Sequence, residues 1–300
     1  MKRAMDLAKL GLGNVSPNPL VGCVIVYENR IIGEGWHQKY GGPHAEVNAI
    51  ESVVDKKLLP KSTLYVNLEP CAHFGNTPPC ADLVVSHDVK KVVIANIDPN
   101  PKVAGGGIKK LKDAGIEVVT GICEKEGLWL NRRFFTYMER QRPYIILKWA
   151  QTQDSFVARK NYDSKWISNA YSRQLVHKWR SEEPAILVGY QTALHDNPQL
   201  NVRDWSGKDP LRLVIDPDLS LPKEHKFFDG SQKTVVYNLS KSDDVDDISY
   251  QRISNRRDFV KEILSDLYKR GVQSVIIEGG ASTINKFINE GDWDEARVFI

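Results

Sequence analysis

The sequence lacks long apolar runs, and none approaches the roughly 18 residues that a membrane-spanning helix requires. It also lacks the apolar core and cleavage site of a secretory signal, because its first residues form an amphipathic helix pattern instead. Its four cysteines are irregularly spaced, which excludes a disulfide framework and favours a reducing cytoplasm. The net charge of +3 is too small to indicate a nucleic-acid or membrane partner.

What is present is the composition of an ordinary globular protein, 41% hydrophobic and 26% charged over 300 residues. That length accommodates two domains of the usual size. Strand and helix signals alternate in both halves, which predicts α/β layers around a largely parallel or mixed sheet. The charged segment that ends at Pro143 predicts a boundary, so the expected domains are residues 1–142 and 143–300.

Apolar, β-branched runs predict the strands, and the short Glu28-Asn29 turn predicts that the first two form a hairpin. The expected strands are Leu20–Tyr27, Arg30–Trp36, Ser62–Leu68, Lys90–Asn96, Ile116–Val119, Tyr144–Ala150, Ala185–Gly189, Leu211–Asp216, Lys233–Leu239 and Ser274–Gly280. The expected helices begin near His44, cover Pro79–His87, Gly106–Gly115, Glu124–Glu139 and Asn169–Ser181, and include Phe259, Ile263 and Leu267 at a four-residue interval. The acidic segment Ser240–Ser249 is expected to be a solvated loop.

A histidine, a glutamate and two cysteines form a pattern suited to a catalytic metal. His44 and Glu46 open an expected helix, and Cys71 and Cys80 flank a loop rich in glycine and proline. Catalytic zinc takes three protein ligands and keeps one open position, and imidazole and thiolate are suitable donors. We therefore predict His44, Cys71 and Cys80 as zinc ligands and Glu46 as the proton carrier, as in zinc-dependent base deaminases. A closed structural site with His73 as a fourth ligand is the rival interpretation.

Several motifs resemble a known family. The stretches "NPLVGCVIV", "GGPHAEVNAI", "EPCAHFGNTPPC" and "DPNPKVAGGGI" are similar to the bifunctional deaminase–reductases of riboflavin biosynthesis. In the second half, "LKWAQTQDSFVA", "DSKWISN", "ILVGYQTALHDNPQLNVR" and "VIIEGGAS" resemble the reductase domain of that family, in the same order. The resemblance covers essentially the whole chain. The cysteine loop is its most specific part, because eight residues separate the cysteines instead of the two of generic deaminases.

For the first domain, the resemblance implies a cytidine-deaminase-like, three-layer fold that hydrolytically deaminates a diaminopyrimidinone ribosyl phosphate. Zinc would lower the pKa of its bound water from roughly 9 on the aqueous ion toward about 7. Glu46 would carry the proton to the ring nitrogen and then to the departing ammonia. The substrate-binding residues that the family pattern implies here are Asn18, His37, His73, Asp98 and Asn100.

For the second domain, the resemblance implies a dihydrofolate-reductase-like α/β fold that uses NADPH to reduce the ribosyl group to ribityl. The sequence has no GxGxxG fingerprint, but Gly279 and Gly280 follow an expected strand and precede a helix, so backbone N–H groups can approach a pyrophosphate. The implied substrate-binding residues are Lys148, Ser164, Arg180, Asp196, Leu200, Arg203 and Glu278. The implied cofactor-binding residues are Trp166, Ser168, Thr192, Gly279 and Gly280.

The sequence departs from the family pattern in three places. Asn76 stands where a basic residue is frequent, and Ser155-Phe156 stands where Gly-Lys is common. The chain also ends at Ile300 inside an expected strand, so the reductase domain is expected to be incomplete.

The expected partners are a small-molecule pyrimidine ribosyl phosphate and further copies of the chain, with no nucleic acid and no membrane. One alternative is a zinc deaminase whose second domain is a degenerate binding module. A nucleic-acid base deaminase is a second alternative, which the low net charge and the long cysteine insert disfavour. A structural zinc protein is the third.

Overall fold

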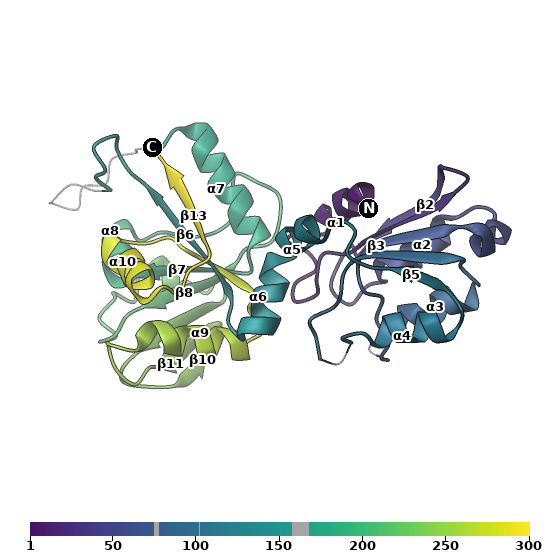
Figure 1. Ribbon diagram of the computed structural model, residues 1–300. Coiled ribbons are helices and arrows are strands. Elements are labelled where there is room, and N and C mark those ends of the chain that lie inside the picture. Colours follow the sequence, from purple (N-terminus) through teal and green to yellow (C-terminus); the bar gives the residue numbers. More distant parts are fainter. Residues whose placement is uncertain (75–77, 102, 158–167) are drawn as a thin grey trace. The chain divides into compact units, whose positions relative to one another are not determined.

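The computed structural model describes residues 1–74, 78–101, 103–157 and 168–300. The chain folds as two compact units, Met1–Arg140 and Gln141–Ile300. Each unit contains its own sheet with helices packed against it (Figure 1). Within the described ranges, no helix combines the length and the apolar character needed to cross a membrane.

The first unit is built on a five-stranded sheet in the order β2-β1-β3-β4-β5. Its strands are β1 (Gly22–Tyr27), β2 (Arg30–Trp36), β3 (Thr63–Leu68), β4 (Lys91–Asn96) and β5 (Glu117–Val119). Strand β1 is antiparallel to β2 and β3, whereas β3, β4 and β5 run parallel. The predicted hairpin and the other strands predicted in this half are therefore confirmed.

Helices cover both faces of this sheet and give it three layers. They are α1 (Lys2–Lys9), α2 (Ala45–Ser52), the 3-10 helix η1 (Lys56–Lys61), α3 (Cys80–Ser86), α4 (Gly106–Asp113), α5 (Glu124–Leu130) and α6 (Arg132–Arg140). Side chains alternate along β1, so Cys23 and Ile25 pack with α2, α3 and α4, while Val24 packs with α1. A Cβ on Gly35 would lie 2.3 Å from the backbone nitrogen of Ala49, so only glycine lets α2 approach β2 this closely.

The single helix predicted over Glu124–Glu139 is wrong, because the chain forms α5 and α6 instead. Asn131 lies between them and is only 3% exposed. Its side-chain Oδ1 accepts a hydrogen bond from the N–H of Leu20 at 2.8 Å, and its Nδ2 donates to the Leu20 carbonyl at 2.9 Å. These tertiary hydrogen bonds override the helical periodicity at this point.

The second unit is built on an eight-stranded sheet in the order β10-β11-β9-β8-β7-β12-β6-β13. Its strands are β6 (Tyr144–Ala150), β7 (Ala185–Gly189), β8 (Leu211–Ile215), β9 (Thr234–Asn238), β10 (Asp243–Val245), β11 (Ile248–Arg252), β12 (Ser274–Ile277) and β13 (Glu295–Phe299). Neighbouring strands are parallel except β10 and β11, which are antiparallel. The strands predicted in this half are confirmed, although β12 ends three residues before Gly280.

The central strands of this sheet are buried on both faces, which explains their continuous apolar sequences. The helices are α7 (Ala170–Glu182), α8 (Tyr190–Asp196), the 3-10 helix η2 (Lys226–Phe228), α9 (Phe259–Lys269) and α10 (Ala281–Glu290). Leu187 of β7 packs in the cluster that contains Ile263 of α9 and Phe287 of α10. The next residue, Val188, packs in the cluster on the opposite face with Ala193 of α8.

The solvated loop predicted over Ser240–Ser249 is wrong, because β10 and β11 form an antiparallel hairpin there. Strand β11 pairs in parallel with β9 and so extends the sheet at this edge. The residues of β10 are all exposed, as the acidic composition suggested. Charged side chains on an edge strand hinder pairing with a further strand, so the composition and the strand are compatible.

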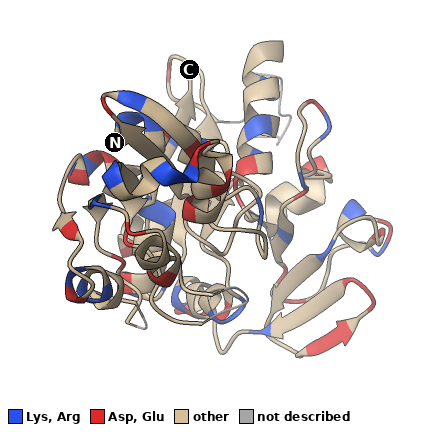
Figure 2. Ribbon diagram, turned by 90° about the vertical axis from the view of Figure 1, so that its right-hand side faces the viewer, with Lys and Arg blue, Asp and Glu red and all other residues tan. Residues whose placement is uncertain are grey.

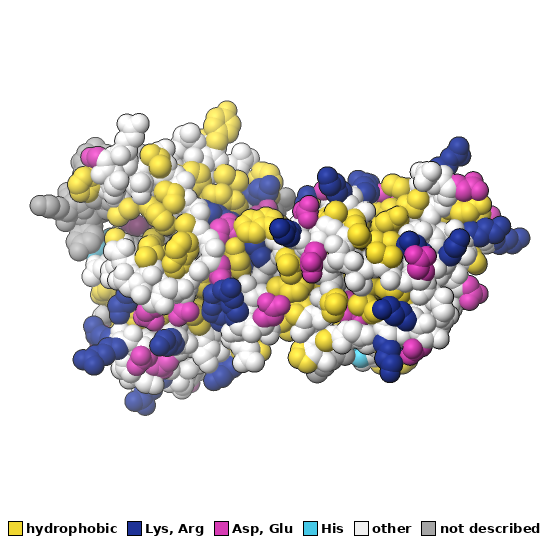
Figure 3. All heavy atoms as spheres, in the orientation of Figure 1, with side chains coloured by type: hydrophobic (Ala, Val, Ile, Leu, Met, Phe, Trp, Pro, Cys, Tyr) yellow, Lys and Arg dark blue, Asp and Glu magenta, His cyan; other side chains and the backbone are white. Residues whose placement is uncertain are grey.

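Charged residues of both signs are mixed along the chain. Figure 2 shows Lys and Arg interspersed with Asp and Glu over the helices and strands. Figure 3 shows the same mixture on one face of the molecule, with apolar side chains between them. On the face shown, no large area of a single charge is present, in agreement with the net charge of +3.

Candidate functional site

Three ligand-type residues converge in the first unit. His44 is the N-cap of α2, Cys71 follows β3, and Cys80 is the first residue of α3. Their ligand atoms all lie within 4.8 Å of one another, and His44 Nδ1 is 3.6 Å from Cys71 Sγ and 3.3 Å from Cys80 Sγ. Two donors at about 2.0–2.3 Å from a tetrahedral zinc ion lie about 3.6 Å apart. The geometry and the donor chemistry of this cluster therefore fit zinc.

The cluster has three members among the described residues. Neither Glu46 nor His73 belongs to it, and His73 is exposed. Three protein ligands are the number typical of catalytic zinc, whereas a structural site is closed by a fourth. The described residues therefore do not form the closed site in which His73 would be the fourth ligand.

The two thiols of the cluster differ in acidity. Hydrogen bonding with Cys80 lowers the pKa of Cys71 to about 4, against the effect of burial and with additional help from His44. The same hydrogen bond and burial raise the pKa of Cys80. The hydrogen bond with Cys71 also raises the pKa of His44, although burial opposes it. The lowered pKa of Cys71 favours its thiolate, the form that binds a metal cation.

Glu46 lies in the first turn of α2 and is 3% exposed. Burial is the main reason that its pKa rises to about 7, and the nearby Cys71 thiolate raises it further, while His44 opposes the shift. A carboxyl group that titrates near neutral pH can accept a proton and then return it. Glu46 is therefore suited to proton transfer beside the cluster.

Asn18 and His37 form a hydrogen-bonded pair close to His44. His37 Nδ1 lies 3.0 Å from the carbonyl oxygen of Pro43, and its Nε2 lies 3.0 Å from Asn18 Nδ2. Because a carbonyl can only accept, Nδ1 donates and Nε2 accepts from the amide. Burial, the largest influence, lowers the pKa of His37 and favours this neutral form. The His37 ring also contacts the His44 ring edge to face, with centroids 5.5 Å apart.

A buried carboxylate, Glu69, fixes the segment that carries Asp98 and Asn100. Glu69 is 4% exposed and accepts hydrogen bonds from the N–H groups of Asp98, Gly105 and Ile108 at 3.3, 3.0 and 3.1 Å. Asp98 accepts a hydrogen bond from the N–H of Asn100 at 2.8 Å. Burial raises the pKa of Asp98 to about 6. Glu69 is absent from the residues predicted from the sequence, although it stands in the "EPC" motif, where a glutamate follows a strand.

In the second unit, Arg180 of α7, Lys148 of β6 and Glu278 after β12 form a buried ionic cluster. Arg180 Nη2 lies 2.6 Å from one carboxylate oxygen of Glu278, and Lys148 Nζ lies 3.6 Å from the other. Burial raises the pKa of Glu278, but the two cations outweigh it, so the net shift is downward. Arg180 is therefore held in the interior of the unit and is not a solvated surface arginine.

The other described residues that the family pattern assigns to the substrate in this unit are Asp196, Leu200 and Arg203, and none of them belongs to the ionic cluster. Arg180 Nη1 donates to the carbonyl of Asn201 at 3.3 Å, which places the segment after Leu200 beside the ionic cluster. Leu200 is buried with φ of 57°, whereas Arg203 is exposed. Asp196 is exposed at the end of α8.

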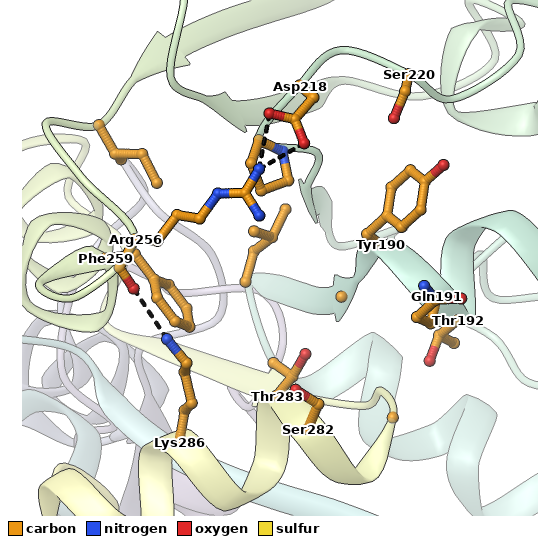
Figure 4. Close-up of a pocket in the computed structure, with 15 residues that line it drawn as sticks. Tyr190, Gln191, Thr192, Asp218, Ser220, Arg256, Phe259, Ser282, Thr283 and Lys286 are labelled. Carbon is orange, nitrogen blue, oxygen red and sulfur yellow. Dashed lines mark hydrogen bonds and ion pairs between the residues drawn. The ribbon is translucent and has the colours of Figure 1, made fainter.

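A pocket of about 290 Å³ opens at the carboxyl ends of β7, β8 and β12 (Figure 4). In parallel α/β sheets, ligands bind at this edge, where neighbouring connections leave in different directions. Thr192 and Gly280 line the pocket, and a Cβ on Gly280, which has φ of 31°, would lie 3.2 Å from Thr192 Oγ1. The volume is at the lower end of the roughly 300–1,000 Å³ typical of ligand sites, so it suits part of a dinucleotide.

The two other predicted cofactor residues that the structure describes do not line this pocket. Gly279 is buried against β7, where a Cβ would lie 2.9 Å from Val188 Cα, so only glycine allows this close approach. Ser168 precedes α7, and its carbonyl accepts a hydrogen bond from Arg173 at 3.2 Å.

Two families of known proteins match the chain. Residues 1–96 match the cytidine and deoxycytidylate deaminase zinc-binding region, and residues 143–300 match the RibD C-terminal domain. The riboflavin biosynthesis protein RibD of Aquifex aeolicus is 42% identical, over 100% of this chain and 85% of that relative. The protein of the same name from Actinobacillus pleuropneumoniae is 41% identical, over 100% of this chain and 82% of that relative. The chain belongs to the RibD family.

Solved structures agree with membership in the RibD family. A deaminase/reductase of Thermotoga maritima has a TM-score of 0.88 at 41% identity, over 97% of this chain and 82% of that one. RibD of Acinetobacter baumannii has a TM-score of 0.90 at 39% identity, over 99% of this chain and 84% of that one. The predicted fold class, a cytidine-deaminase-like domain followed by a reductase domain, is confirmed.

As a RibD-family protein, the chain is a bifunctional enzyme of riboflavin biosynthesis, a deaminase and a reductase in one polypeptide. Zinc and NADPH are its cofactors, and its substrate is a small pyrimidine. Ser164 and Trp166, predicted from the family pattern, lie outside the described residues, as does Asn76. Ser155 has φ of 69°, so this position adopts the left-handed conformation that glycine favours.

Proposed function

We propose that the first unit hydrolytically deaminates a diaminopyrimidinone ribosyl phosphate, with His44, Cys71 and Cys80 as its zinc ligands. The observation that supports this most directly is the convergence of one imidazole nitrogen and two sulfurs, with the Glu46 carboxylate outside the set. Zinc, when bound, supplies the Lewis acid that activates a water molecule for attack on the pyrimidine.

Glu46 carries the proton in this mechanism. Its carboxylate accepts a proton from the attacking water as the water oxygen bonds to the ring carbon that bears the amine, and it passes that proton to the ring nitrogen. Glu46 then takes the remaining proton from the added oxygen and gives it to the exocyclic nitrogen; the C–N bond breaks as the C=O bond forms, and ammonia leaves. Burial raises the pKa of Glu46 to about 7, which suits a carboxylate that first accepts a proton and then returns it.

The substrate-binding residues of this unit fall into two groups. Asn18 and His37 share a hydrogen bond beside His44, so we assign them to the pyrimidine end of the substrate. Asp98 and Asn100 lie on the segment that Glu69 holds, and we assign them to the ribosyl phosphate. His73, in the loop after Cys71, completes the assignment as a contact to the substrate.

Ammonia release from the diaminopyrimidinone phosphoriboside tests the deaminase assignment. Glu46→Gln is expected to lower the rate by about 10²–10⁴-fold, the usual contribution of general acid–base catalysis, with bound zinc unchanged. Glu51→Gln is the matched control, because Glu51 lies on the same helix with an exposed side chain. A chelator should abolish the activity of the unaltered enzyme. Full activity in Glu46→Gln would remove Glu46 from the mechanism.

We propose that the second unit binds the ribosyl phosphate beside its ionic cluster and the cofactor in the adjoining strand-end pocket. NADPH, when bound, supplies the hydride for C1′ of the ribose, and the ring oxygen that leaves C1′ takes up a proton. The substrate residues are Lys148, Ser164, Arg180, Asp196, Leu200, Arg203 and Glu278. The cofactor residues are Trp166, Ser168, Thr192, Gly279 and Gly280. Support comes from the contacts of Arg180 and Lys148 with Glu278 and from the position of Thr192 and Gly280 in the pocket.

We also infer that the deaminase domain is residues 1–142 and the reductase domain residues 143–300. The division of the chain after Arg140 and the family match from residue 143 support this boundary. The mixed surface charge and the net charge of +3 favour an enzyme that does not bind nucleic acid (Figure 3). We propose a cytoplasmic location, which the reduced cysteines favour, and a homo-oligomeric state, which is common for such enzymes.

A further inference from the structure

Residues 201–209 form a loop that packs along one side of helix α7. A Cβ on Gly207, which has φ of 143°, would lie 2.5 Å from Ser181 Cβ, so only glycine allows this approach. Ser181 lies one turn after His177 on α7, and the two side chains therefore share one side of the helix. His177 is only 2% exposed, and it contacts the first residues of the loop. The loop thus takes its position from this side of α7.

The His177 ring makes a hydrogen bond whose direction is fixed by its partner. Nδ1 lies 3.0 Å from the carbonyl oxygen of Asn201, and because a carbonyl only accepts, Nδ1 donates. Nδ1 therefore does not also accept from the N–H of Arg203, which lies 3.4 Å away. Burial is the main reason that the pKa of His177 is lowered, and Arg180 and Arg203 lower it further, which favours the neutral ring. In that form Nε2 has no proton to donate to the Asp204 carboxylate, 3.4 Å away, so the ring acts through Nδ1.

Asn201, which His177 holds, is a partner of two arginines. Arg180 Nη1 donates to the same Asn201 carbonyl at 3.3 Å. Arg203 Nη1 donates to the side-chain Oδ1 of Asn201 at 3.2 Å. A carbonyl has two lone pairs, so it accommodates both His177 and Arg180. The position of Asn201 therefore couples a buried guanidinium to an exposed one.

We propose that His177 is a positioning residue of the reductase: by donating to the Asn201 carbonyl, it sets the loop so that Arg180 and Arg203 bind the substrate phosphate together. The proposal rests on the assignment of both arginines to the substrate, made above. Guanidinium groups bind phosphate most effectively when their N–H groups are held in a fixed geometry. Arg203 is exposed, and without a fixed partner it would give up more side-chain freedom when the substrate binds.

The test is steady-state reduction of the deaminated pyrimidine ribosyl phosphate by the full chain, followed as oxidation of NADPH. His177→Ala should raise the KM for this substrate about tenfold, because Asn201 loses the donor that fixes it, and should change kcat less than about twofold. His177→Asn should bring KM back to within about threefold of the unaltered protein, since its amide stands where Nδ1 stood and donates to the same carbonyl. His177→Gln should not restore KM, because its amide takes the place of Nε2.

A substrate without the phosphate separates positioning from a merely structural role. His177→Ala and the unaltered protein should reduce the corresponding riboside with kcat/KM values within about twofold of each other, because the arginines then have no phosphate to bind. Ser181→Ala is the matched control: it keeps the Cβ that faces Gly207, and it removes only a hydroxyl that donates to the Lys178 carbonyl at 2.7 Å. It should leave KM unchanged for both substrates.

A fluorescence titration with NADPH checks that each variant is folded, and if His177→Ala does not bind NADPH, the Asn and Gln variants decide. Equal losses toward the phosphoriboside and the riboside, or equal KM values for His177→Asn and His177→Gln, would overturn the proposal. If Arg203→Ala raises KM for the phosphoriboside and His177→Ala does not, the substrate assignment of Arg203 stands and the role of His177 is refuted. If Arg203→Ala leaves KM unchanged, the substrate assignment itself fails, and the proposal with it.

Discussion

The carboxylate of Glu69 caps the N-terminus of α4, where its Oε1 accepts a hydrogen bond from the backbone N–H of Ile108 at 3.1 Å. Its Oε2 accepts from Gly105 and Asp98 in the same way. Free N–H groups and the helix dipole stabilise a negative charge at this position, and the carboxylate in turn satisfies three backbone donors. Glu69 thus helps to determine where Asp98 lies.

Replacing Glu69 by alanine should destabilise the first unit by about 2–4 kcal/mol, because buried N–H groups lose their acceptor. Deamination should show a raised KM with zinc still bound, since the change affects the segment of Asp98 and not the ligands. The measurements are the thermal unfolding midpoint, metal content and ammonia release. Glu117→Ala is the control, because Glu117 forms an ion pair with Lys91 at 2.7 Å, is 58% exposed and should contribute less than about 1 kcal/mol. Equal effects of the two substitutions would contradict the role given to Glu69.

Replacing either Cys71 or Cys80 by serine should abolish stoichiometric zinc, because a hydroxyl is a much poorer ligand than a thiolate for this ion. Metal analysis of the purified protein measures the loss directly. Cys123→Ser should retain zinc, since Cys123 lies at the start of α5 and does not belong to the ligand cluster. Full zinc content in both cluster variants would mean that the ion binds elsewhere.

Removing the guanidinium of Arg180 should destabilise the second unit by about 3–5 kcal/mol, because Glu278 would remain buried with only Lys148 nearby. Arg180→Ala should therefore lose reduction while ammonia release continues, as the two reactions use different units. Lys178→Ala, on the same helix, is the comparison: Lys178 lies 3.9 Å from Glu182 and is 44% exposed, so the expected change is below about 0.5 kcal/mol. Loss of both activities in Arg180→Ala would show that the units depend on each other.

The stability of the second unit should fall in acid because of Glu278. Its pKa is lower in the folded protein than the usual value of about 4.3. Its stabilising contribution is therefore complete above that usual value and is lost as the pH falls through the folded pKa. Unfolding measured between about pH 6 and pH 3 should show a steeper decline for the unaltered protein than for Glu278→Gln. Identical slopes would indicate that the carboxylate is not stabilised by Arg180 and Lys148.

Local sequence patterns predict most of the sheets, because β-branched runs that are buried on both faces leave few alternatives. They fail at Asn131, where side-chain hydrogen bonds to Leu20 break a helix that periodicity alone predicts to be continuous. They also fail at β10, an edge strand formed by backbone pairing in a segment with no apolar alternation. The first failure involves a partner that is distant in the sequence. The second involves backbone pairing that the side-chain pattern does not indicate.

The candidate sites divide in the same way. His44, Glu46, Cys71 and Cys80 stand in short motifs, so the residue types and their spacing are enough to predict their chemistry. Glu69 acts through backbone groups of residues about 30 to 40 positions away, and no residue type marks those partners. The strand-end pocket combines the ends of β7, β8 and β12 from three places in the chain, and only the folded sheet brings them together.

In the described residues, no apolar cluster draws members from both units, so each unit has an interior of its own. A chain weakened at Leu213 would still release ammonia but would leave its product unreduced, whereas one weakened at Ile94 would stop at the first reaction. Destabilising mutations in this enzyme should therefore form two groups. One group should accumulate the substrate of deamination, and the other should accumulate the deaminated product. Co-expression of one variant with a defective first unit and another with a defective second unit should restore riboflavin synthesis.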